Sequence, residues 1–113
     1  MMKDSALKSL VLAAFLCAAV PALAASGDAE AGSKKVVEKG CPACHGPKGI
    51  SVSPEFPNLA GQNADYLAAA LHHYKNGKRK NPIMQGQVAN LTERDILDVT
   101  AYFASQNGLY VKN

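Results

Sequence analysis

Two cysteines and a histidine lie within five consecutive residues of this chain, in the order Cys41, Pro42, Ala43, Cys44, His45. The C-x-x-C-H spacing is the attachment signature of c-type haem. Two thiols on one turn can each add to a vinyl group of the porphyrin, and the imidazole that follows then falls beneath the iron. The motif therefore predicts one covalent haem, held by Cys41 and Cys44, with His45 as the proximal ligand of its iron.

The same five residues allow three alternative interpretations. A redox or structural disulfide also uses C-x-x-C, but in thioredoxin-like proteins that motif belongs to a βαβ unit, which this sequence does not indicate. A zinc site requires four protein ligands, of which Cys41, Cys44 and His45 could supply three at most, and a second Cys/His pair is missing. A chance occurrence is less favoured because the chain begins with an export signal, and haem is attached outside the cytoplasm.

The second axial ligand is expected to be a methionine, because His and Met hold the iron in electron-transfer haem proteins and Met raises the potential. After Met2 the chain contains one methionine, Met84, in a stretch that is predicted to be a loop. A methionine in an apolar helical stripe is more often core filler, so the loop position favours Met84 as the distal ligand. His72 and His73 are the rivals, and both are expected at the surface of their helix.

The start of the chain has the pattern of a secretory signal peptide. Lys3 and Lys8 precede an apolar run at residues 10–20, and small residues before Ala25 form a cleavage pattern. We expect residues 1–24 to be removed, residues 25–113 to form the functional domain, and the protein to be periplasmic. The alternative is an uncleaved N-terminal anchor, although the apolar run is shorter than the roughly 20 residues of a membrane span.

Composition restricts the remainder to one small domain. The chain has 113 residues, with 12 Lys and Arg against 9 Asp and Glu, and no tryptophan. This small excess of basic residues does not indicate a nucleic-acid-binding protein. A domain of this size usually needs a cofactor, a metal or disulfides to complete its core.

Helical periodicity predicts an all-α domain with three main helices and two long loops, and the C-x-x-C-H motif indicates that these loops wrap one haem. The first helix starts near Ala29 and stops at Gly40, and the second starts at Gln62 or Asn63. The expected loops cover residues 41–58 and 83–91, and loops of that length in a small domain indicate that they wrap a ligand. The third helix follows Thr92, with Asp95 at the reciprocal capping position, and ends at residues 106–108.

The sequence resembles the class I c-type cytochromes, and among them the short bacterial cytochromes of the c-553 and c-4 type. The resemblance extends over residues 25–113. Its motifs are Gly27-Asp28, Cys41 to His45, Pro57-Asn58-Leu59, Met84 and the terminal helix with Tyr102; the finer likeness is carried by residues 58–62, Tyr66-Leu67 and residues 76–79.

This resemblance implies further roles for individual residues. The carbonyl of Pro57, 12 residues after His45, is expected to accept a hydrogen bond from that histidine. The first and last helices are expected to cross where Gly32 meets Tyr102 or Phe103. Tyr66 and Arg79 are expected to approach the haem propionates; both also fit as ordinary stripe and surface residues.

These observations favour a soluble one-electron carrier, not an enzyme, that acts as a monomer. Its partners are expected to be redox proteins in transient complexes, with basic residues that either steer acidic surfaces or form a solvated turn. The alternatives are a haem subunit of a larger dehydrogenase or oxidase, and a sensing domain with an open sixth position on the iron. The candidate steering residues are Lys48, Lys75, Lys78, Arg79 and Lys80.

Overall fold

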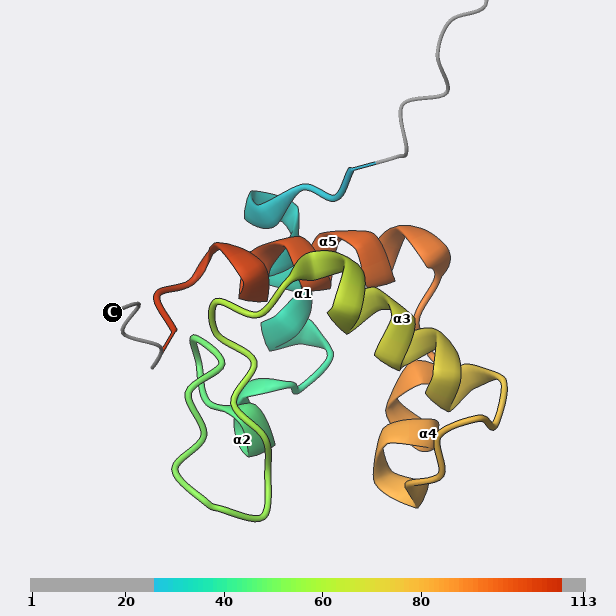
Figure 1. Ribbon diagram of the computed structural model, residues 1–113. Coiled ribbons are helices and arrows are strands. Elements are labelled where there is room, and N and C mark those ends of the chain that lie inside the picture. The colour runs from blue at the N-terminus through green and yellow to red at the C-terminus, as the bar shows by residue number, and fades with distance from the viewer. Residues whose placement is uncertain (1–25, 109–113) are drawn as a thin grey trace, which may run out of the picture.

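The computed structural model describes residues 26–108, and this part of the chain is helical without strands (Figure 1). The predicted signal peptide and cleavage position lie outside the described residues. No helix within residues 26–108 is long and apolar enough to cross a membrane. The helices are α1 (Ala29–Glu38), α2 (Pro42–His45), α3 (Ala64–Lys75), α4 (Pro82–Val88) and α5 (Glu93–Ser105).

The three predicted main helices are present, and their ends have clear causes. Asp28 caps α1 by accepting from two backbone amides of its first turn, and Asn63 caps α3 by accepting from Asp65 N. Thr92 and Asp95 form the reciprocal capping box that the sequence predicts for α5. Each cap satisfies amides that have no partner inside the helix.

The prediction of two helix-free loops is wrong. The first loop begins with α2, a single turn with Pro42 at its first position. The second expected loop, residues 83–91, contains most of α4, because Asn81 caps Ile83 N and Met84 N and Pro82 has a backbone geometry that suits a helix start. Met84 therefore lies in the first turn of a short helix.

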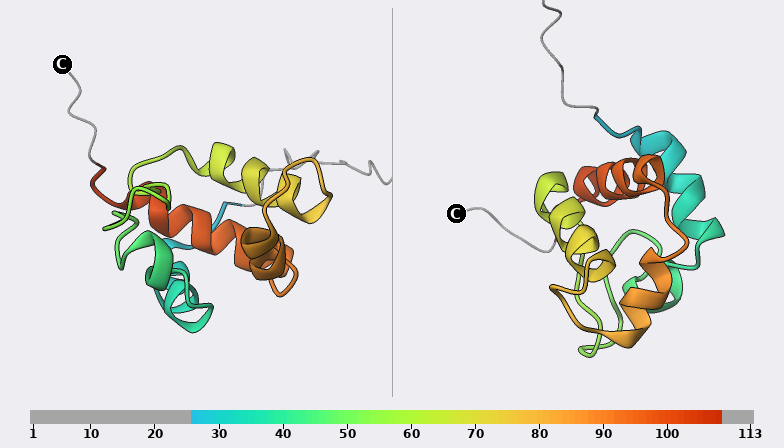
Figure 2. Two further views of the ribbon diagram at one scale, coloured as in Figure 1. Left: turned by 90° about the horizontal axis from the view of Figure 1, so that it is seen from below. Right: turned by 90° about the vertical axis from the view of Figure 1, so that its right-hand side faces the viewer.

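Helix α5 packs between α1 on one side and α3 on the other, as the right view of Figure 2 shows. The crossing of α1 and α5 depends on Gly32, since a Cβ there would lie 2.0 Å from the Asp98 carbonyl oxygen and 2.9 Å from Tyr102 Cβ. Of the two predicted aromatic partners, Tyr102 is the one that meets this glycine. Gly27 makes a similar approach to Leu97, which the sequence did not indicate.

A buried carboxylate also joins α1 to α5. Asp98 is 2% exposed and accepts from the Asp28 backbone amide at 2.9 Å and from Lys35 Nζ at 2.7 Å. Arg94 Nη1 adds a contact at 3.5 Å. The amide of Asp28 and the ammonium of Lys35 hold the pKa of Asp98 below its usual value, against the opposing effect of burial.

The apolar core consists of two separate clusters of buried side chains. One joins Val36, Leu67, Val99 and Phe103, and the other joins Val88, Leu91 and Ile96. Four of these residues also line a cavity between the clusters: Leu67, Leu91, Val99 and Phe103. The described domain thus forms two small cores with a cavity between them, which fits the expectation that a ligand completes the interior.

Candidate functional site

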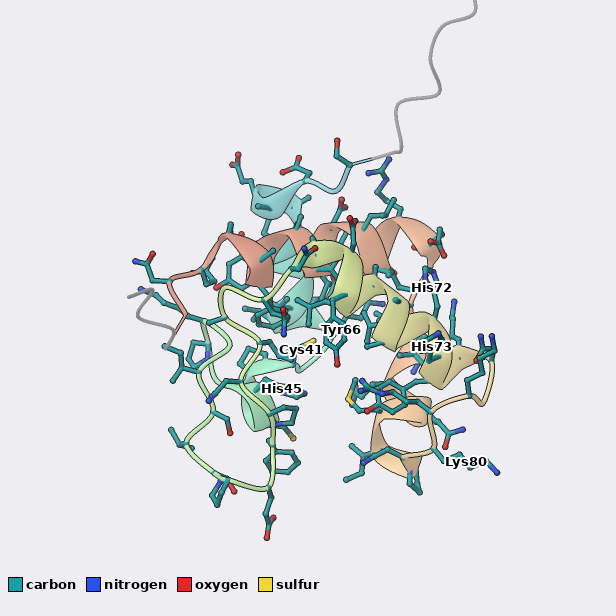
Figure 3. All side chains as sticks on the ribbon, in the orientation of Figure 1. Cys41, His45, Tyr66, His72, His73 and Lys80 are labelled. Atoms are coloured by element: carbon teal, nitrogen blue, oxygen red, sulfur yellow. The ribbon has the colours of Figure 1, made fainter. Side chains whose placement is uncertain are left out.

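A cavity of about 780 Å³ lies between the C-x-x-C-H segment and helices α3 and α4. Its lining includes Cys41, Cys44 and His45 on one side and Met84 on α4. Figure 3 shows Cys41, His45 and Tyr66 around the inner part of the molecule, with the histidine side chain directed from α2 toward this space. The structure thus brings both cysteines, the histidine and the methionine to one cavity.

The two cysteines are held by the turn of α2. The backbone amide of Cys41 donates to Val36 O at 3.0 Å, which ties the start of the motif to the end of α1, and His45 N donates to Cys41 O at 3.0 Å. Both thiols are free and partly buried. Burial raises the pKa of the free Cys41 thiol above its ordinary value, with a smaller contribution from Cys44.

His45 has one ring nitrogen engaged and the other free. Its Nδ1 lies 2.9 Å from the Pro57 carbonyl oxygen, the contact that the family resemblance implies. The ring is 8% exposed, and the edge of Phe56 packs against it with 6.4 Å between ring centroids and 68° between planes. With Nδ1–H donating to Pro57, Nε2 carries the lone pair that a metal requires.

Phe56 is a site residue that the sequence did not single out. It lines the cavity and packs against His45, whose ring can otherwise turn about its bond to the backbone. The only sequence signal was its position next to Pro57, and the contact with the imidazole is decided by the folding of the loop.

The rival histidines do not line the cavity. His72 Nε2 lies 2.9 Å from both carboxylate oxygens of Glu93, and its side chain is 40% exposed. His73 is exposed on α3. Met84, in contrast, is half-buried on the cavity wall. Of the three candidates for the second axial position, Met84 is the one that reaches the cavity.

Tyr66 and Arg79 meet at the cavity rim. Arg79 Nη2 donates to Tyr66 Oη at 3.3 Å, and its guanidinium carbon lies 5.6 Å from the centroid of the Tyr74 ring. The contact with Tyr66 raises the pKa of Arg79 above its ordinary value. All three residues line the cavity, so a charged and a hydroxyl donor are held together at its opening.

The predicted steering residues separate into three groups. Arg79 and Lys80 line the cavity, whereas Lys48 and Lys78 are exposed and do not. Lys75 Nζ donates to the Leu91 carbonyl at 2.6 Å, which ties the end of α3 to the segment before α5. The basic residues therefore contribute to the cavity rim mainly through residues 79–80.

The donor set fits haem c. Two thiols one turn apart, an imidazole with a free Nε2 and a thioether share one cavity with apolar walls. Within residues 26–108 no group of three or more His, Cys, Asp or Glu side chains is placed to hold a metal ion, so the zinc alternative gains no support. The βαβ unit of a thioredoxin-like site is also absent from the described residues.

Comparison with known proteins agrees with this chemistry. The family model described as "Cytochrome c" matches residues 29–107. Cytochrome c4 of Pseudomonas aeruginosa is 49% identical over 82 residues, which cover 73% of this chain and 40% of that protein. Cytochrome c-554(548) of Halomonas halodenitrificans is 40% identical over 84 residues, which cover 72% of this chain and 99% of that protein.

The fold is also found among solved structures. The crystal structure of reduced recombinant cytochrome c4 from Pseudomonas stutzeri matches with a TM-score of 0.68 and 43% sequence identity, covering 74% of this chain and 47% of that one. The chain spans about two fifths of the Pseudomonas aeruginosa cytochrome c4. Family, fold and cavity agree, and the chain belongs to the cytochrome c family as a class I c-type cytochrome, with covalently attached haem c as its cofactor.

Proposed function

We propose that this chain is a periplasmic one-electron carrier in which His45 and Met84 are the two axial ligands of the haem iron. The observation that supports this most directly is the shared cavity, where His45 is oriented by Pro57 and Met84 lies on the α4 wall. Transfer of electrons by a haem c protein follows from the family. The ligand pair, the compartment and the partners are the parts proposed here.

When bound, haem c supplies an iron that alternates between the ferric and ferrous states. The chain's residues then have separate tasks. Cys41 and Cys44 anchor the porphyrin through thioethers, His45 donates Nε2 and Met84 donates Sδ. Asn81 caps α4, and the Cys41 amide ties the start of α2 to Val36 of α1. Because both segments that would carry the iron ligands are held in this way, we expect little rearrangement between oxidation states.

The cavity walls favour the reduced form. Leu67, Leu91, Val99 and Phe103 face the cavity and keep water away. An apolar environment disfavours the additional positive charge of the oxidised iron, and a methionine ligand acts in the same direction. We therefore expect a higher potential than a bis-histidine site in the same fold would have.

Tyr66 and Arg79 are proposed to receive the anionic edge of the porphyrin. The guanidinium is already oriented by the Tyr66 hydroxyl and the Tyr74 ring, so its remaining N–H groups are available at the cavity opening. An arginine fork suits a carboxylate well. Replacing Arg79 with Leu should weaken this contact and change the pH dependence of the reduction potential.

The proposed partners are redox proteins with acidic patches, met in short-lived complexes. Arg79 and Lys80 lie at the cavity rim beside Tyr66 and Ile83, which are 52% and 58% exposed. Exposed apolar side chains next to basic ones suit a small, weak docking surface. The rate of electron transfer to an acidic partner should fall as salt rises. Stable co-purification with a dehydrogenase or oxidase would instead favour the subunit alternative.

The decisive experiment is the absorption spectrum of the oxidised holoprotein, produced in a host that attaches haem c. A weak far-red sulfur-to-iron band is expected in the wild type and should be absent in Met84→Ala. The variant should keep its haem, have a lower potential and bind carbon monoxide when reduced. Met84→His is the matched control, since it restores a sixth ligand without the sulfur band.

Other outcomes separate the alternatives. A wild-type spectrum with haem peaks but no sulfur band would reject Met84 as the ligand and favour a sensing domain. An unchanged spectrum in Met84→Ala would reject the same assignment.

A further inference from the structure

The loop that follows His45 is closed upon itself by the side chain of Asn58. Asn58 Oδ1 accepts from the Ser51 backbone amide at 2.7 Å. Next to this contact, the amides of Leu59 and Ala60 both donate to Gly49 O, at 2.7 and 3.0 Å. The return of the chain after Pro57 is therefore fixed by side-chain and backbone bonds together.

Ser51 links the same loop to the cysteine motif. Its hydroxyl lies 3.2 Å from the Cys44 carbonyl oxygen and 2.8 Å from the Ser53 carbonyl oxygen. The Ser53 amide in turn donates to Ser51 Oγ at 3.1 Å. Ser51 thus contacts Cys44, just before His45, through its hydroxyl. Its backbone amide contacts Asn58, just after Pro57.

These contacts and the His45–Pro57 hydrogen bond together form a closed ring. Cys44 precedes the histidine, Asn58 follows the proline, and Ser51 joins the two. The 2.9 Å contact between His45 Nδ1 and Pro57 O closes the ring. If the Ser51–Asn58 link opens, the Pro57 carbonyl gains freedom to turn away from His45.

We propose that Asn58 and Ser51 are positioning residues, which hold the Pro57 carbonyl on His45 and thereby tune the strength of that histidine as an iron ligand. The inference rests on the proposed role of His45 as the proximal ligand. A carbonyl that accepts from Nδ1–H makes the imidazole a stronger donor at Nε2, which favours the oxidised iron. Loosening the carbonyl should therefore raise the reduction potential.

The test compares Asn58→Ala with Asn76→Ala in the holoprotein. Asn76 is a matched control, because it is also exposed and its Oδ1 accepts one backbone amide, from Lys78 at 3.0 Å, in a turn away from His45. In Asn58→Ala we expect the His45 Nδ1 proton to exchange with solvent about fivefold faster in the reduced state, measured by NMR. The reduction potential should rise in the same variant, and both quantities should stay at wild-type values in Asn76→Ala.

Asn58→Asp supplies the rescue. It keeps a side-chain oxygen for the Ser51 amide, so the exchange rate should return close to that of the wild type. The potential is not read in this variant, because its new charge acts on the iron directly. If Asn58→Ala does not give folded protein, Ser51→Ala removes the contact to Cys44 and should also accelerate the exchange of the His45 proton.

An Asn58→Ala protein with wild-type exchange and potential would overturn the inference. So would equal changes in Asn58→Ala and Asn76→Ala, since they would indicate a general loss of stability. Failure of the proposed function is recognised separately, from the wild-type spectrum. A missing sulfur band there would reject Met84 as the ligand and leave the His45 exchange experiment interpretable.

Discussion

Replacing Gly32 with Ala should destabilise the holoprotein by forcing α1 and α5 apart. The added Cβ would lie 2.0 Å from the Asp98 carbonyl oxygen, and ordinary contact starts at 3.4 Å, so the helices must separate by about 1.4 Å at this point. Backbone atoms meet here, so no change of rotamer relieves the clash. Overpacking of this kind costs up to about 3 kcal/mol, and the better helix propensity of alanine returns about 1 kcal/mol. A net loss of about 2 kcal/mol follows.

The assay is thermal unfolding of the holoprotein followed by circular dichroism. For a domain of this size about 2 kcal/mol corresponds to a fall in Tm of roughly 10 °C. Gly86→Ala is the matched control, since Gly86 lies in α4, has negative φ and would place its Cβ in open space. It should be neutral or raise the Tm slightly. A Gly32→Ala protein that melts within about 2 °C of the wild type would refute the close-approach reasoning.

The remaining predictions concern charge, cofactor and surface. The hydrogen bonds to Asp98 lower its pKa, so the stability that they add is fully present above the unfolded pKa of about 3.9. This stability is lost as the pH falls through the lower pKa of the folded state. Chemical denaturation between pH 2 and 6 should show the decline. Asp98→Asn should reduce that pH dependence and cost about 2 kcal/mol at pH 7, leaving the part that comes from Asp95, whose pKa is also lowered, chiefly by the Thr92 amide. A pH profile unchanged from the wild type would exclude Asp98 as a source of the decline. The double variant Cys41→Ala/Cys44→Ala should be colourless and lack a cooperative unfolding transition, because no haem then fills the cavity between the two apolar clusters. A well-folded colourless protein would contradict this role. His72→Ala should change stability by less than about 0.5 kcal/mol and leave the spectrum unchanged, as expected when a partly exposed contact with the Glu93 carboxylate is lost. A spectral change would return this histidine to the list of ligands.

Much of the candidate site was predictable because its chemistry is local in sequence. The C-x-x-C-H motif places two thiols and an imidazole on one turn, whatever surrounds it. The caps at Asn63 and Thr92 were predictable for the same reason, since each side chain bonds amides within three residues. Met84 was singled out as the one methionine after Met2. The expectation that it lies in a loop was wrong, because a Pro and an Asn that suggest a turn also start a helix.

The tertiary structure decided what depends on contacts between distant segments. In the sequence Asp98 is indistinguishable from an exposed, charged helix residue. In the structure it is buried and accepts a hydrogen bond from Asp28 at the start of α1, 70 residues earlier. Phe56 and Asn58 gain their roles only when the loop folds back on α2.

Sequence by itself thus determined the cofactor, the helical class and the main helix starts. The five-residue motif, the helical periodicity of apolar residues and the capping side chains each depend on residues close together in the chain. Only the folded chain decided which aromatic residue meets Gly32, that neither rival histidine lines the cavity, and how the Pro57 carbonyl is held on His45. These features depend on how the folded chain packs, at separations from 7 residues between Ser51 and Asn58 to 70 residues between Gly32 and Tyr102, and periodicity and spacing do not encode such packing.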